Sequence, residues 1–136
     1  MQIKLASLVF LLLTSLNCWA DSVEWRGYQI YYTSLNSMLI PQNVAKAHNI
    51  VRSKNRIVTN ISIRKEKKPI VATLKGTNQN LFGQIFTMNF DEVLESTAIY
   101  YLSNQLIDER DTLSFDVNIS IPSEDESYAL KFKRQY

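Results

Sequence analysis

Residues 113–121 read Leu-Ser-Phe-Asp-Val-Asn-Ile-Ser-Ile, an unbroken alternation of apolar and polar side chains. Successive side chains of a β-strand point to opposite faces, so a period of two separates a core-facing row from a solvent-facing row. Leu113, Phe115 and Val117 begin the apolar row, and small or charged residues fill the other. The stretch therefore predicts a strand with one face in a hydrophobic core and one face in water.

The same period of two recurs along most of the chain. The segments that carry it are 23–32, 57–64, 70–74, 82–90, 98–106 and 128–133. Turn-forming and charged residues separate these segments, at 65–69, 77–80, 108–111 and 122–126. About seven short strands at this spacing are typical of an antiparallel sandwich or barrel. We expect a mainly β fold, an immunoglobulin-like antiparallel β-sandwich.

One segment, residues 41–49, departs from the β pattern. Pro41 suits the first position of a helix, and Asn49 tolerates the left-handed backbone that often follows a helix end. Val44 and Ala47 lie three residues apart, so they would share the helix face that turns to the core. The sequence therefore predicts one short helix near residues 41–49.

The N-terminal segment 1–20 has the features of a cleavable secretory signal peptide. Lys4 precedes an apolar run over residues 5–13, and Ala20 supplies the small residue that a signal peptidase recognises. An apolar run of this length is too short to cross a bilayer, which takes roughly 20 residues. We expect cleavage after Ala20 and a periplasmic location. The mature chain, residues 21–136, should form a single domain without a transmembrane segment.

Cysteine and histidine usage restricts the chemistry of the mature chain. Cys18 is the only cysteine and leaves with the signal peptide, so no disulfide, thiol nucleophile or thiolate metal ligand remains. Lipidation of Cys18 is disfavoured, because Asn17 stands where that processing requires a small residue. His48 is the only histidine, and the sequence contains no nucleophile, zinc or phosphate-binding motif. We therefore expect a non-enzymatic protein with no cofactor and no metal.

A basic segment, Arg52-Ser53-Lys54-Asn55-Arg56, connects the predicted helix to the next strand. Arginine can hold a carboxylate or phosphate through two parallel hydrogen bonds, so this loop is the candidate binding site. Ser53 and Asn55 would add polar contacts beside the three cations. The alternative is architectural: Arg52 or Lys54 folds back to pair with an acid of the neighbouring strand and fixes the loop.

Several short motifs run through the mature chain. They are Tyr28-x-x-x-Tyr32, Asn36-Ser37, Pro41, Ala45-Lys46-Ala47, residues 50–56, Asn60-Ile61-Ser62, Gly76-Thr77, Asn80-Leu81-x-Gly83-Gln84 and Ala98-Ile99-Tyr100-Tyr101. Together they resemble an uncharacterised proteobacterial family, domain of unknown function 4426 (DUF4426). Arg52-Ser53-Lys54 is the most specific part of the pattern. Asn49 stands where the family usually has glycine, and asparagine also tolerates the left-handed backbone conformation.

The resemblance implies an exported, single-domain, β-rich protein of Gram-negative bacteria. The family has no established activity, so no catalytic residue carries over. Our first hypothesis is a non-enzymatic interaction module that binds another envelope protein or an anionic envelope component through an end loop or edge strand. The alternatives are a carrier of small apolar ligands and a carboxylate-based hydrolase. Nucleic acid is not expected as a partner, and the sequence leaves the oligomeric state open.

Overall fold

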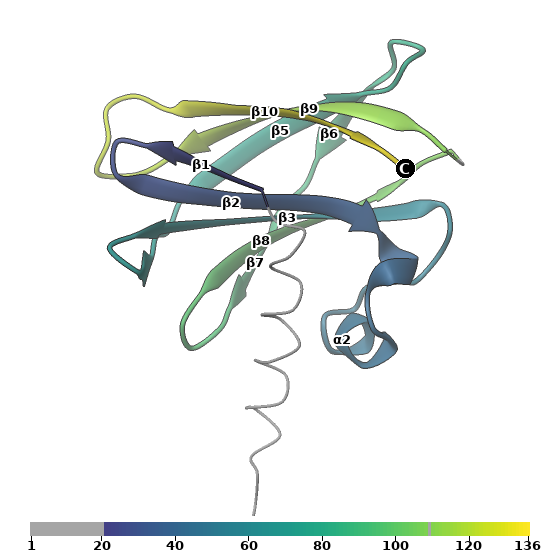
Figure 1. Ribbon diagram of the computed structural model, residues 1–136, viewed down its shortest axis with the longest axis horizontal. Helices are drawn as coiled ribbons and strands as arrows, with labels where there is room; N and C mark the ends of the chain where they lie inside the picture. The colour runs from purple at the N-terminus through teal and green to yellow at the C-terminus, as the bar shows by residue number, and fades with distance from the viewer. Residues whose placement is uncertain (1–20, 109) are drawn as a thin grey trace, which may run out of the picture.

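The computed structural model describes residues 21–108 and 110–136; the predicted signal peptide, residues 1–20, lies outside the described residues. Two antiparallel sheets pack face to face (Figure 1), which confirms the expected mainly β sandwich. Among the described residues, no helix has the length and apolar character needed to cross a membrane.

Over residues 21–108 and 110–136, six of ten strands belong to the first sheet. Its strands follow the order β1 (Asp21–Trp25), β2 (Tyr28–Asn36), β3 (Arg56–Lys65), β8 (Ile99–Leu106) and β7 (Asp91–Leu94), and the short β4 (Lys68–Pro69) pairs with the end of β3. The second sheet has the order β10 (Tyr128–Gln135), β9 (Thr112–Ser120), β5 (Thr73–Gln79) and β6 (Ile85–Met88).

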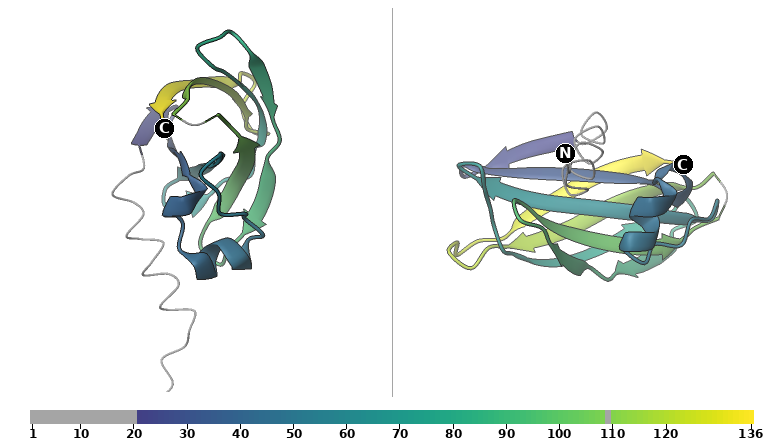
Figure 2. Two further views of the ribbon diagram at one scale, coloured as in Figure 1. Left: turned by 90° about the vertical axis from the view of Figure 1, so that its right-hand side faces the viewer. Right: turned by 90° about the horizontal axis from the view of Figure 1, so that it is seen from below.

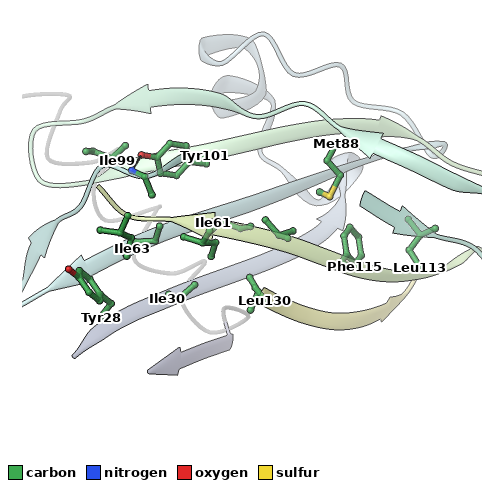
Figure 3. Close-up of a cluster of buried hydrophobic side chains, with 14 of the residues drawn as sticks. Tyr28, Ile30, Ile61, Ile63, Met88, Ile99, Tyr101, Leu113, Phe115 and Leu130 are labelled. Atoms are coloured by element: carbon green, nitrogen blue, oxygen red, sulfur yellow. Dashed lines mark hydrogen bonds between the residues drawn. The ribbon is translucent and has the colours of Figure 1, made fainter. Parts of the chain in front are cut away.

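The main core lies between the inner faces of the two sheets (Figure 3). Leu113, Phe115, Val117 and Ile119 are buried, whereas the four residues that follow them in turn are exposed. The apolar residues of segment 113–121 therefore face the core and the polar residues face solvent, as predicted. Isoleucines of β2 and β3 pack against this row from the opposite sheet, and Ile30 and Ile61 are both 0% exposed.

A smaller core covers the outer face of the first sheet. The helix α2 (Gln42–Ala47) follows the 3-10 turn η2 (Ser37–Leu39), which confirms the predicted helix in a shorter form. Val44 faces this core as expected, but Ala47 is exposed and its place is taken by Ala45. Ile40, Val44, Ala45, Ile50 and Val58 form the cluster. The helix is therefore held against β3 by apolar contacts.

The described residues form ten strands where about seven were expected. Segment 82–90 is divided, because β6 pairs in the second sheet and the chain then crosses to form β7 in the first sheet. The predicted turn at 77–80 was placed too early, since β5 continues to Gln79 and the connection follows it. The charged segment at 108–111 was expected to separate two strands, and those strands, β8 and β9, belong to different sheets.

Candidate functional site

The predicted binding loop lies at one end of the sandwich. Residues 52–56 connect α2 to β3 beside the end of β2, and Ile107 N donates to the carbonyl oxygen of Asn55 at 2.7 Å. The β5–β6 and β8–β9 connections reach the same end (Figure 1). We call this region the loop end. It comprises residues 37–56, 80–85, 106–108, 110 and 111.

Polar side chains of the neighbouring turn hold the main chain of the basic loop. Ser37 is 0% exposed, and its hydroxyl accepts from Ser53 N at 2.9 Å and donates to the Ser53 carbonyl oxygen at 3.0 Å. Asn36 Nδ2 donates to the Lys54 carbonyl oxygen at 2.8 Å, and Asn55 N donates to Ser53 Oγ at 3.2 Å. The loop therefore has a fixed backbone, and Ser53 belongs to its framework.

The cations of the loop are placed differently from one another. Arg52 is exposed and its Nη2 donates to the carbonyl oxygen of Met38 at 3.0 Å, whereas the architectural alternative required an acid. Lys54 is also exposed, and over residues 21–108 and 110–136 neither side chain forms an ion pair. The positive charges of Arg52 and Lys54 are thus presented to solvent.

Arg56 is the least accessible of the three cations in the predicted site. It is half-buried at the start of β3 and lies opposite Leu106 of β8. Its Nε atom is buried and has no hydrogen-bond partner among the described residues. The end of the predicted loop therefore lies opposite an exposed apolar residue, because Leu106 is 62% exposed.

Sequence reasoning missed an apolar projection at the same end. Leu81, Phe82 and Ile85 are 73%, 87% and 67% exposed, although the alternation of segment 82–90 predicted that Phe82 would face the core. We call residues 80–85 the apolar tip. Figure 2 shows the loop end face on, with the apolar tip projecting at one edge and α2 at the other.

Asn80 organises the apolar tip. Its Oδ1 accepts from Phe82 N at 3.1 Å and from Gln84 N at 3.0 Å, and its own N donates to the Gln84 carbonyl oxygen. Gly83 has φ +81, a left-handed conformation that glycine adopts without strain, and its N donates to the Asn80 carbonyl oxygen at 3.1 Å. The spacing of Asn80 and Gly83 could have predicted this turn from the sequence.

A pair of amide side chains ties the base of the apolar tip to the other sheet. Asn78 of β5 is 1% exposed and contacts Gln105 of β8. Asn78 Nδ2 donates to Gln105 Oε1 at 2.6 Å, and Gln105 Nε2 donates to Asn78 Oδ1 at 2.9 Å. The apolar tip thus starts from a point where the two sheets are joined by two hydrogen bonds.

Exposed apolar side chains are concentrated at the loop end. Of nine large hydrophobic residues that are exposed in the described chain, seven lie there and two, Val71 and Leu94, lie toward the opposite end. The seven are Met38, Leu39, Val51, Leu81, Phe82, Ile85 and Leu106. Isolated exposed apolar residues need no explanation, but their gathering at one end marks a surface suited to contact.

The opposite end of the sandwich is covered by charged turns instead. Arg26, in the β1–β2 turn, donates to Glu124 at 3.2 Å and to Glu126 at 2.8 Å in the β9–β10 turn. Glu66 and Lys67 form the β3–β4 turn. The two ends therefore differ in chemistry: at one end Arg26 is paired with two acids, whereas at the loop end exposed apolar side chains lie beside Arg52 and Lys54, which form no ion pair within the described residues.

Hydroxyl groups form a short chain inside the sandwich near the loop end. Ser34 of β2 is hydrogen-bonded to Thr59 of β3 at 2.9 Å and also to the Tyr136 hydroxyl. Burial raises the pKa of Tyr136 to about 12, while the Ser34 hydrogen bond and the charge of Arg134 act in the opposite direction. Tyr136 therefore stays protonated at neutral pH and serves as a structural hydrogen-bonding group.

A shallow groove of about 620 Å³ opens on the second sheet. It forms because β6 ends at Met88 while β5 begins at Thr73, so part of the β5 edge has no partner strand there within the described chain. Apolar and polar side chains share its lining, which includes Leu74, Lys75, Thr77, Met88, Phe90 and Asp116. The groove is open and mixed in character, unlike the close-packed interior between the sheets.

Metal-binding geometry can be assessed over the same residues. Nowhere in 21–108 or 110–136 do three or more His, Cys, Asp or Glu side chains gather around a position that could hold a metal ion. His48 is half-buried and follows the end of α2. That the protein works without a metal or enzymatic activity stays a prediction from its sequence.

Solved structures with the same fold are known. A DUF4426 family protein (PA0388) from Pseudomonas aeruginosa PAO1 is 28% identical, with a TM-score of 0.75 over 86% of this chain and 94% of that chain. A copper-bound variant of FetP from uropathogenic Escherichia coli strain F11 is similar at 12% identity, with a TM-score of 0.62 over 87% of this chain and 96% of that one. At that identity the likeness to FetP concerns the fold alone.

The sequence comparisons agree with the resemblance noted in the motifs. No curated protein sequence matches the chain. The family model for DUF4426, a domain of unknown function, matches residues 22–136, which is nearly all of the described domain. The chain therefore belongs to the DUF4426 family.

Proposed function

We propose that this chain is an exported periplasmic interaction module without enzymatic activity, which binds an envelope protein or an anionic envelope component through its loop end. Export and location are supported by the signal-peptide features of residues 1–20. The observation that carries the proposal is the contrast between the two ends of the sandwich. Over the described residues, seven of the nine exposed large hydrophobic side chains gather at the loop end, beside Arg52 and Lys54, which form no ion pair there.

The geometry of the basic loop supports binding by Arg52 and Lys54. Its main chain is held by Ser37 and Asn36, so the loop does not need to become ordered when a partner binds. Prior ordering of this kind reduces the entropy lost on association. Two exposed cations on a fixed backbone attract an anionic group and also orient it.

A pair of matched variants tests the proposal. Arg52→Ala/Lys54→Ala removes two exposed cations from the loop end, and Lys67→Ala/Lys68→Ala removes two exposed cations from the opposite end. Each protein is immobilised and used to capture components from an envelope extract at low and at high salt. The wild type and the Lys67/Lys68 variant should retain the same components, and the Arg52/Lys54 variant should lose the salt-sensitive ones. Identical captured sets for all three proteins would refute a role for the loop.

The groove on the second sheet keeps the small-ligand carrier as a second candidate. Its apolar residues Leu74, Met88 and Phe90 lie beside Lys75 and Asp116, a combination that suits an amphipathic molecule. Native mass spectrometry of the purified protein is the direct test. A bound molecule lost in Met88→Lys would support the carrier, and the bare polypeptide mass in every preparation would count against it.

A further inference from the structure

The loop end combines apolar side chains and cations in a definite arrangement. The apolar tip projects from the second sheet, and a second apolar group, Met38, Leu39 and Val51, lies beside Arg52 below the first sheet. The segments that carry the two groups lie at the same end of the molecule (Figure 1). The two groups lie on separate elements, so a partner that touches both must extend across the whole end.

The apolar tip is free of charge over a long stretch. Residues 76–90 contain no Asp, Glu, Lys, Arg or His. The chain elsewhere is rich in charge, because 21% of all residues are charged. A hairpin without charge, with Phe82 and Leu81 at its turn, can enter a medium of low polarity without moving an ion out of water.

Four backbone N–H groups of the apolar tip are satisfied by internal hydrogen bonds. The N–H groups of Asn80, Phe82, Gly83 and Gln84 all donate within the turn, and each of these bonds has an atom of Asn80 as its donor or acceptor. Unsatisfied backbone groups are the main obstacle to placing a non-helical segment in lipid. These four N–H groups therefore keep their hydrogen-bond partners when the tip enters a less polar environment.

Cations outnumber acids over the described part of the loop end. Lys46, Arg52, Lys54 and Arg110 are exposed there and Arg56 is half-buried, whereas the acids are exposed Asp108 and half-buried Asp111. Asp111 Oδ1 accepts from Thr112 N at 2.8 Å, so this carboxylate takes part in local structure. An extended anionic surface would be attracted to this end.

From these features we propose that the loop end docks on the surface of an anionic lipid bilayer, with Leu81 and Phe82 inserted at the headgroup boundary and Arg52 and Lys54 on lipid phosphates. The proposal rests on the proposed function and names its anionic partner. Binding of this kind grows with the apolar area inserted and with attraction to anionic lipid. Cations close to such a surface contribute additively to the affinity.

A bilayer fits the geometry better than a protein partner does. Phe82 projects at 87% exposure on a convex turn, so a protein would need a matching hollow together with a separate site for the cations. A fluid bilayer surface adapts to both groups at once. The charge-free tip, with four internally bonded N–H groups, suits the headgroup boundary, where the surrounding medium becomes less polar.

Vesicle flotation with the processed protein tests the proposal. Residues 21–136 contain all ten strands and both cores, and an intact-mass measurement confirms that the hydrophobic segment 1–20 is gone. The probes are vesicles of phosphatidylglycerol and phosphatidylethanolamine in equal parts, and vesicles of phosphatidylcholine alone. We expect the protein to float with the anionic vesicles and to stay behind with the neutral ones. Equal binding to both, or to neither, would overturn the proposal.

Two apolar double variants separate insertion from simple charge attraction. Leu81→Ser/Phe82→Ser should weaken binding to the anionic vesicles at least about ten-fold, because burial of a Phe side chain alone contributes that much. The matched control is Val71→Ser/Leu94→Ser, which removes two exposed apolar residues from the opposite end and should bind as the wild type does. Equal binding by the two variants would refute insertion of the tip.

The cation variant tests the phosphate contacts. Arg52→Ala/Lys54→Ala should weaken binding to the anionic vesicles by about thirty-fold, since each cation near an anionic membrane contributes about five-fold. Undiminished vesicle binding by this variant would refute the proposed phosphate contacts.

A fluorescent probe reports insertion directly. Phe82→Trp should show a blue-shifted emission with anionic vesicles and quenching by brominated lipid, while Val71→Trp should show neither. An unchanged Phe82→Trp spectrum would refute insertion even if the protein floats with the vesicles. If anionic vesicles are not bound but Arg52→Ala/Lys54→Ala still loses envelope components, the bilayer proposal fails and the broader interaction function stands.

Discussion

The amide pair between Asn78 and Gln105 offers a test of how the apolar tip is anchored. Its two hydrogen bonds, 2.6 and 2.9 Å long, join the second sheet to the first, and Asn78 is 1% exposed. Asn78→Leu replaces the amide by an apolar side chain of similar length and leaves the Gln105 amide without its partner. A net hydrogen bond contributes about 1 kcal/mol, and a buried polar group left unpaired costs about 1–3 kcal/mol. We expect Asn78→Leu to lower the free energy of unfolding by about 2 kcal/mol.

The reciprocal variant and the double variant complete a thermodynamic cycle. Gln105→Met leaves Asn78 unpaired and should also lower the free energy of unfolding by about 2 kcal/mol. In Asn78→Leu/Gln105→Met no amide is left unpaired, so the loss should be only about 1–2 kcal/mol. The two sites are therefore expected to couple by about 2–3 kcal/mol.

Urea denaturation gives these free energies directly. The fluorescence of Trp25 reports unfolding, because it is the sole tryptophan of residues 21–136 and packs against Tyr28 and Tyr128. Asn104→Leu is the control, since Asn104 is exposed on the same strand as Gln105 and its loss should change stability by less than about 0.5 kcal/mol. If the stability losses of the two single variants add up to that of the double variant within about 0.5 kcal/mol, the role assigned to the amide pair is refuted.

Two further predictions concern packing and pH. Gly76→Ala should destabilise the protein by about 1–2 kcal/mol, because the new Cβ would lie 3.0 Å from Val117 Cγ2 and 3.2 Å from Met88 Sδ; a melting temperature equal to that of the wild type would contradict this. Burial raises the pKa of Tyr136 to about 12, so stability that is complete below the unfolded pKa of about 10 should fall as the pH rises toward 12, by up to about 2–3 kcal/mol. Urea denaturation across this range should show a shallower loss for Tyr136→Phe, and an equal slope would contradict the assignment.

The strands were predictable wherever one continuous face is buried. Over residues 113–121 the apolar row enters a single core, and the order of burial follows the sequence directly. Segment 82–90 shows why the same rule fails elsewhere. Its apolar residues keep a period of two while the chain forms a turn, a strand of one sheet and a crossing to the other. Periodicity records which side chains alternate, but it contains no information about which sheet receives them.

Single polar residues were harder to interpret. Asn78 suggested a turn, because asparagine favours turns, yet it is a buried member of β5 whose amide is satisfied by Gln105, a partner distant in sequence. The helix raised a related difficulty. Ala45 rather than Ala47 is buried, since the face that turns inward is decided by where β3 passes beneath α2. Both errors have the same origin: the deciding contact comes from a distant segment.

The sequence composition predicted which loop is basic, but it did not predict which apolar side chains lie exposed beside that loop. The basic loop was found from its three cations, whereas Phe82 was assigned to the core by its spacing. The polar residues of the loop end explain the difference. Ser37 and Asn80 use their side chains to hydrogen-bond backbone groups of two exposed turns, so polar contacts hold the main chain of both turns in place.

That division of roles leaves the remaining side chains free to face outward. Lys54 and Phe82 both lie on main chain that is ordered by hydrogen bonds from neighbouring residues, Asn36 in one case and Asn80 in the other. A partner that contacts them therefore meets a surface whose backbone is already fixed, and little conformational entropy is lost on binding. If either asparagine were replaced by alanine, the composition of the loop end would keep its cations and apolar residues, but the turn that presents them would lose its order. Binding should then weaken although every contacting side chain is still present.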